Sequence, residues 1–141
     1  MNKLFPDEKI IKTRYFGIHQ DWEVPVPGFF IISTNTPHRS IEEFSDDELF
    51  EFVLLVRLLR RGMTKVLSIR DVYFFQNEDT EHGFHLWVFP RLGWMEKFGR
   101  KIQSVRPIME YAREHMLSDK DFLLVREYAE KMRIFMQENW Q

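Results

Sequence analysis

A long amphipathic helix between strand-like segments limits the folds open to this chain. Ser45 and Glu48 fit a capping box, in which each side chain bonds to the backbone N–H of the other residue. Apolar residues then recur at steps of three and four, which predicts a helix of about five turns. They are Leu49, Phe52, Val53, Val56, Leu59, Met63 and Val66. Arg57, Arg60 and Arg61 lie off this stripe, and we expect them to face solvent.

Strand and helix signals around this helix predict an α+β fold. Segments rich in β-branched and aromatic residues predict strands, and they are 10–18, 29–34, 71–76 and 84–89. Pro107 suits the first turn of a helix over about 106–116, and Ser118 opens a last helix. We therefore expect an antiparallel sheet of about five strands, a long packed helix and additional C-terminal helices.

Composition narrows the class of protein. A length of 141 residues favours one domain, with a core at about 10–91 and a helical extension at about 104–138. The net charge of −2 argues against nucleic acid as a partner, and the lack of 18 consecutive apolar residues argues against a membrane. The chain has no cysteine and no apolar leader, so we expect a cytoplasmic protein.

Residues 80–91 (TEHGFHLWVFPR) carry the clearest chemical signal. Side chains alternate along a strand, so His85 shares one face with Gly83 and Trp87. The opposite face is apolar and belongs in the core. A glycine two places before the histidine lets a ligand or another backbone come close. A neutral imidazole in that position is a good nucleophile near neutral pH.

This stretch resembles the signature strand of the histidine-triad (HIT) superfamily, in which three alternating histidines precede two apolar residues and often Pro-Arg. Aligned on Pro90-Arg91, Gly83 takes the first histidine position, His85 the second and Trp87 the third. The resemblance implies that His85 is the nucleophile. It also implies that the backbone carbonyl at position 83 holds the Nδ1–H of His85.

The resemblance implies further site residues. Thr80 would help the leaving group, and Gln76 or Asn77 would contact the nucleotide phosphates. Arg91 is a further candidate phosphate donor, and His38 lies near the place of another active-site histidine. Trp87 either stacks on a base or fills the space of the missing histidine.

The remaining histidines carry weaker signals. His82 would point to the opposite face of the strand, and its spacing to Glu78 and Glu81 matches no strong metal pattern. His19 and His115 are expected to be structural or exposed. We expect no metal and no cofactor.

These observations predict a nucleotide hydrolase or transferase that forms a covalent nucleotidyl-histidine on His85. Its substrates would be dinucleoside polyphosphates, such as diadenosine polyphosphates, or nucleoside phosphoramidates. The resemblance also implies a homodimer. One alternative is a catalytically weak or inactive nucleotide-binding module, and another is an unrelated α+β interaction protein that carries this motif by chance.

Overall fold

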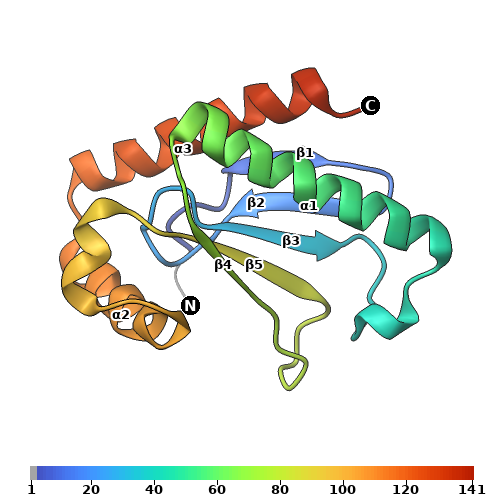
Figure 1. Cartoon of the computed structure of the whole chain (residues 1–141), viewed down its shortest axis with the longest axis horizontal. Coiled ribbons are helices and arrows are strands. Elements are labelled where there is room, and N and C mark those ends of the chain that lie inside the picture. The colour runs from blue at the N-terminus through green and yellow to red at the C-terminus, as the bar shows by residue number, and fades with distance from the viewer. Residues whose placement is uncertain (1–2) are drawn as a thin grey trace.

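The computed structural model describes residues 3–141 and contains one five-stranded antiparallel sheet (Figure 1). The strand order is β1-β2-β3-β5-β4, so β1 and β4 form the edges. The strands are β1 (Lys9–Lys12), β2 (Phe16–Gln20), β3 (Phe30–Thr34), β4 (Val72–Phe75) and β5 (His85–Pro90). The expected α+β fold is confirmed.

Three long helices accompany the sheet: α1 (Asp46–Leu67), α2 (Val105–His115) and α3 (Asp119–Asn139). Short 3-10 turns are η1 (Ile41–Glu43), η2 (Gly93–Phe98) and η3 (Ile102–Ser104). The predicted capping box at the start of α1 is present, with both reciprocal bonds between Ser45 and Glu48. Within residues 3–141, no helix is long and apolar enough to span a membrane.

The predicted strand over 10–18 is instead a hairpin, with β1 and β2 joined by a turn at residues 13–15. A carboxylate on α1 holds this turn. Glu51 accepts a hydrogen bond from the Thr13 hydroxyl at 2.7 Å and another from the Tyr15 backbone N–H at 2.8 Å. Because Glu51 is more than thirty residues away in the sequence, the strand pattern alone does not reveal the turn.

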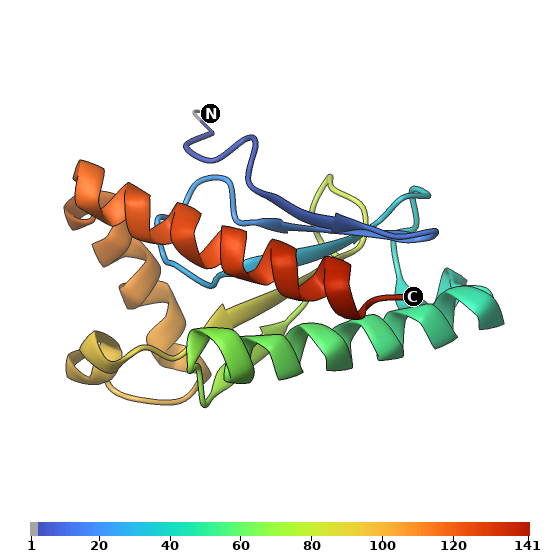
Figure 2. The same cartoon turned by 90° about the horizontal axis from the view of Figure 1, so that it is seen from above.

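Helices α1 and α3 lie side by side over one face of the sheet and enclose the larger core (Figures 1 and 2). The sheet contributes Ile18, Phe30, Ile32 and Val88 to this core, and the helices contribute Leu59, Met63, Ala129 and Met132. Alternation along β5 therefore places its even-numbered side chains against α1 and α3, as expected.

Helix α2 packs on the opposite face of the sheet, but only toward one end. Ile108 and Ala112 of α2 are buried in a cluster with Phe29 and Phe89. The other end of this face, where β5 begins, leaves His85 half-buried. The C-terminal helices thus close the core and leave the start of β5 accessible.

The apolar stripe of α1 is only partly in the core. Phe52, Leu59 and Met63 are buried, whereas Leu49 is 43% and Val53 is 51% exposed. The apolar stripe of α1 is therefore broader than the part of the helix that the sheet and α3 bury.

Candidate functional site

His85 is the first residue of β5, and its ring is fixed by a short hydrogen bond. The Nδ1 atom lies 2.6 Å from the carbonyl oxygen of Gly83. Because a carbonyl can only accept, Nδ1 carries the proton. The neutral ring then has its lone pair on Nε2, which leaves that atom free to act as a nucleophile. This is the hydrogen bond that the resemblance implies, and the substitution by glycine preserves it.

The backbone of the loop after β3 comes close to Gly83. A Cβ atom there would lie 3.1 Å from the carbonyl oxygen of His38. That oxygen accepts the backbone N–H of Phe84 at 2.7 Å. The loop after β3 therefore holds the start of β5 and, through it, the carbonyl that positions His85.

The strand register shows which side chains share the face of His85. His85 pairs with Ser33 of β3, and Trp87 pairs with Ile31. Ile31 in turn pairs with His19 of β2. His19 consequently lies on the same face as His85 and Trp87, two strands away from β5.

His19 is a half-buried histidine whose place the sequence reasoning missed. Its ring stacks on Trp22 with centroids 4.5 Å apart, and its Nδ1 lies 2.8 Å from the carbonyl oxygen of Gln20. Burial lowers the pKa of His19, the hydrogen bond to the Gln20 carbonyl partly offsets this, and the nearby cation of Lys3 lowers the pKa further. Alternation along β2 with the correct strand bounds would have placed His19 on this face.

His82 lies beside His85 rather than on the opposite face, and this corrects the expectation. The two ring centroids are 6.0 Å apart. Residues 81–84 precede β5, so strand alternation does not apply to them. Within the described residues, no group of three histidine, aspartate or glutamate side chains could hold a metal ion.

Trp87, at the third motif position, packs between aromatic rings. Its ring centroid is 4.8 Å from that of Phe75 and 6.3 Å from that of Phe29, both with edge-to-face geometry. Trp87 remains half-buried. The indole thus fills space on the sheet and still presents part of its surface.

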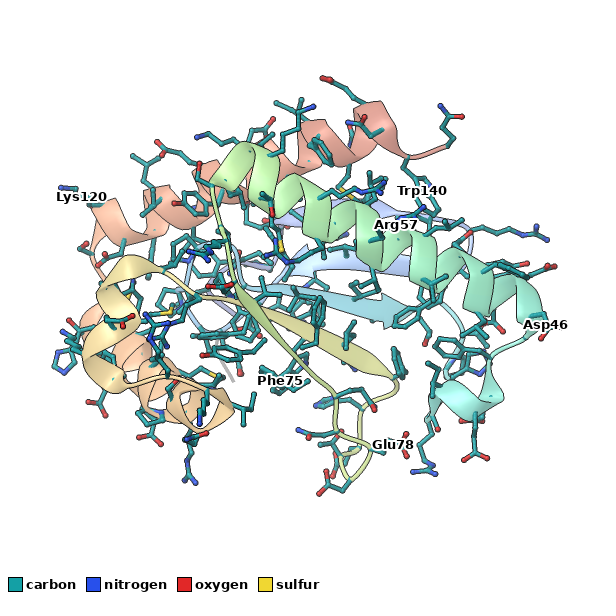
Figure 3. All side chains as sticks on the ribbon, viewed as in Figure 1. Asp46, Arg57, Phe75, Glu78, Lys120 and Trp140 are labelled. Carbon is teal, nitrogen blue, oxygen red and sulfur yellow. The ribbon has the colours of Figure 1, made fainter. Side chains whose placement is uncertain are left out.

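Three predicted site residues lie in the loop between β4 and β5. Thr80 is exposed in the β4–β5 loop, which projects away from the sheet around Glu78 (Figure 3). Gln76 lines a groove beside α1, on the other side of the sheet from His85. Asn77 instead lines a cavity with Trp87. Of the two amides, Asn77 is the better placed to meet a ligand at His85.

Arg91 has contacts that tie it to its own loop. Its guanidinium donates to the carbonyl oxygen of Gly99 at 2.6 Å and lies 3.3 Å from a carboxylate oxygen of Glu96. The side chain is only 10% exposed. Arg91 therefore anchors the segment between β5 and α2, and we leave it out of the proposed site.

His38 is likewise engaged away from His85. Its Nε2 lies 2.7 Å from Oε2 of Glu48, the residue that also caps α1. Only the backbone carbonyl of His38 contacts the motif, where it accepts the backbone N–H of Phe84. We therefore assign the His38 side chain a positioning task at the start of α1.

Comparison with protein-family models gives no match, and no curated protein sequence matches this chain. Solved structures do match. A zinc-bound histidine-triad family protein from Mycobacterium smegmatis superposes with a TM-score of 0.63 at 14% identity, over 94% of this chain and 86% of that one.

Two further solved structures resemble this chain to a similar degree. The diadenosine triphosphate hydrolase of Plasmodium falciparum, in complex with cyclomarin A, gives a TM-score of 0.61 at 16% identity, over 95% of this chain and 79% of that one. A Hit-like protein from Bartonella henselae involved in cell-cycle regulation gives a TM-score of 0.60 at 14% identity, over 90% of this chain and 85% of that one. At such identities the likeness establishes the fold.

Proposed function

This chain has the fold of the histidine-triad proteins, and we propose that it is a nucleotide hydrolase or transferase acting through His85. The observation that carries the proposal is the 2.6 Å contact between Nδ1 of His85 and the Gly83 carbonyl oxygen. It fixes the tautomer and leaves Nε2 to attack phosphorus.

The proposed reaction has two steps. In the first, a bond forms between Nε2 of His85 and the α-phosphorus, while the bond from phosphorus to the leaving group breaks. The leaving group takes a proton, for which the Thr80 hydroxyl is the proposed donor. In the second, water attacks phosphorus, the P–Nε2 bond breaks, a nucleoside monophosphate is released, and the proton lost by the water restores the Thr80 hydroxyl.

Negative charge develops on the phosphoryl oxygens in both steps, and donors aimed at it usually supply the largest catalytic effect. The Asn77 side-chain amide is the proposed donor from the chain. His82, within 6.0 Å of His85 between ring centroids, offers a second N–H. Both lie at or beside the loop that carries Thr80, so closure of this loop on substrate would bring the donors together.

The test is release of AMP from adenosine 5′-phosphoramidate and from diadenosine triphosphate, followed by chromatography. We expect wild-type protein to turn over at least one of the two, and His85→Ala to be inactive with an unchanged fold by circular dichroism. His115→Ala removes an exposed imidazole at the end of α2 and is the matched control. Brief incubation followed by mass spectrometry should detect an acid-labile nucleotidyl adduct. Activity retained by His85→Ala excludes the proposed nucleophile.

A catalytically weak nucleotide-binding module is the second candidate. The observation favouring it is that glycine and tryptophan occupy the outer two motif positions, which removes two imidazoles from the site. Calorimetry separates the candidates, because micromolar binding of AMP without turnover supports the module. Absence of both binding and turnover supports an interaction protein.

We also propose that the protein is a homodimer whose second copy covers a groove between α1 and the β4 edge. This groove has a volume of about 600 Å³ and an almost wholly apolar lining that includes Val53, Phe74 and Leu86. Val53 is 51% and Phe74 is 47% exposed. β4 is an edge strand with unpaired backbone groups on its outer side, and such edges are normally paired or covered.

The charge pattern of α1 fits a second copy of the same chain. The helix begins with acidic Asp46 and Asp47, and carries Arg57 and Arg61 further along at the groove. Figure 3 shows Asp46 at the start of α1 and Arg57 further along the helix. Within residues 3–141, neither arginine makes an ion pair. A two-fold axis across the groove would set the acidic start of each helix against the arginines of the other.

A further inference from the structure

A cavity on the His85 face of the sheet extends beyond Asn77, the one residue of its lining that the proposed mechanism uses. It lies between the β4–β5 edge and α2, with a volume of about 560 Å³. Trp87 and Phe75 form its floor, and Val105 and Met109 line it from α2. Since Trp87 is two residues from His85 on one face of β5, the cavity begins roughly 6.5–7 Å along the strand from the proposed nucleophile.

The rim of this cavity is polar and carries a positive charge. Arg106, Glu110 and Arg113 follow one another at helical spacing along one side of α2, and all three line the cavity. Oε1 of Glu110 lies 3.1 Å from Nε of Arg106. This ion pair is exposed to solvent and therefore weak. The lining residues alone, two cations and one anion, leave a net positive charge, and Asn77 adds an amide from the sheet side. Asp21, which does not line the cavity, interacts with the charge of Arg113.

We propose that this cavity is the leaving-group subsite, and that it takes a planar aromatic ring bearing a negative charge. The inference rests on the proposed function and specifies its substrate class. The flat indole of Trp87 offers a stacking surface, and guanidinium groups at the rim pair with a carboxylate or phosphate. The separation from His85 suits a ring joined to phosphorus through one to three bridging atoms.

This distance separates two substrate classes. In a phosphoramidate of an aromatic amine, a single nitrogen joins the ring to phosphorus, which would place the ring over Trp87. In a dinucleoside polyphosphate, several phosphate atoms and a ribose stand between the α-phosphorus and the second base, which would carry that base beyond the floor of the cavity. The geometry therefore favours aromatic phosphoramidates as substrates.

The kinetic test compares adenosine 5′-(4-carboxyphenyl)phosphoramidate with its phenyl analogue, which lacks only the carboxylate. The measured quantity is the ratio of the two kcat/KM values. In the double variant Arg106→Gln/Arg113→Gln we expect this ratio to fall about tenfold, because the carboxylate loses its charged partners. Arg126→Gln/Lys131→Gln removes the same charge from exposed positions on α3 and should leave the ratio as in wild type.

A binding test decides the subsite independently of turnover. Phenyl phosphate carries a ring and an anion but no nucleoside, and it is titrated while the indole N–H resonance of Trp87 is followed by NMR. Trp87→Phe assigns that resonance. We expect a saturable shift in wild type, none with inorganic phosphate alone, and a several-fold weaker affinity in Arg106→Gln/Arg113→Gln.

The two tests separate the failure of the subsite from the failure of the proposed function. If no phosphoramidate is turned over but the Trp87 resonance shifts saturably, the proposed enzymatic function is wrong and the proposed binding site stands. If the protein turns over phosphoramidates but the Trp87 resonance does not shift, the proposed subsite is wrong and the enzymatic function stands. The same conclusion follows if phenyl phosphate binds the double variant as tightly as it binds wild type.

Discussion

The carbonyl oxygen of His38 accepts the backbone N–H of Phe84 at 2.7 Å, which ties the loop after β3 to the residue that precedes His85. The side chain of His38 lies 2.7 Å from Glu48, at the start of α1. Glu48 thus links the cap of α1 to the loop that positions the motif. Its pKa is held low by the Ser45 backbone N–H first, and also by His38.

Removing this carboxylate should cost stability. We expect Glu48→Ala to lower the free energy of unfolding by about 1–2 kcal/mol, because a capping bond and the His38 bond are lost together. Urea denaturation measures the loss. Asp47→Ala, in the same helical turn but exposed, should cost less, and equal losses in the two variants would contradict this account.

The same carboxylate sets part of the acid sensitivity of the fold. Because the pKa of Glu48 is lower in the folded chain than in the unfolded one, its stabilisation is present above its ordinary pKa, about 4.3. It is lost as the pH falls through the folded-state pKa. Glu48→Ala should therefore differ most from wild type at neutral pH, with the two converging in acid.

Gly62 of α1 packs directly against side chains of α3. A Cβ atom there would lie 2.6 Å from the ring of Phe135 and 2.7 Å from Cε of Met132. Gly62→Ala gains helix propensity but overpacks this contact, so we expect a net loss of about 1–3 kcal/mol. Thermal unfolding provides the measurement. Adding Phe135→Leu should restore part of the loss, and a Gly62→Ala protein as stable as wild type would show that the helices can separate freely.

His19 should make the fold sensitive to pH in a second window. Burial, more than any other cause, lowers the pKa of His19, so the unfolded chain takes up this proton at a higher pH than the folded chain. The free energy of unfolding therefore falls as the pH drops below about 6.5. Urea midpoints at pH 7.5 and 5.5 measure this fall.

The control for this prediction is His19→Gln, which cannot take up the proton. Its absolute stability also reflects the lost stacking on Trp22, so only the change between the two pH values is compared. That change should be smaller in the variant. An equal change in both proteins would place the titrating group elsewhere.

Most of the fold follows from local patterns, because capping and apolar spacing act within a few residues. The start of α1 at Ser45 and the alternation along β5 are examples, and both are present as expected. The turn at Thr13 was missed because it depends on Glu51, which only tertiary structure brings near. Local spacing carries no information on such partners.

Less of the candidate site than of the fold could be predicted from the sequence. His85 and the carbonyl of Gly83 lie in one short segment, so the motif alone places them together. His82 and His19 reach the neighbourhood of His85 by a loop bend and by strand pairing, and neither is encoded in local alternation. Arg91 is a candidate phosphate donor in the sequence, yet its guanidinium donates to the carbonyl oxygen of Gly99.

The groove beside α1 yields the last prediction. Val53 and Phe74 are about half exposed, so a charge at either position should leave the monomer folded. We expect Val53→Glu to convert a dimer to a monomer, because it puts a charged side chain into the apolar contact and can draw Arg57, one helical turn away, from the acidic start of the partner's helix. Sedimentation equilibrium measures the mass. Leu123→Glu alters a side chain on α3 that is 55% exposed, outside the groove, and should leave the assembly intact. A wild-type monomer at micromolar concentration, or a dimer retained by Val53→Glu, would remove this groove as the contact between copies.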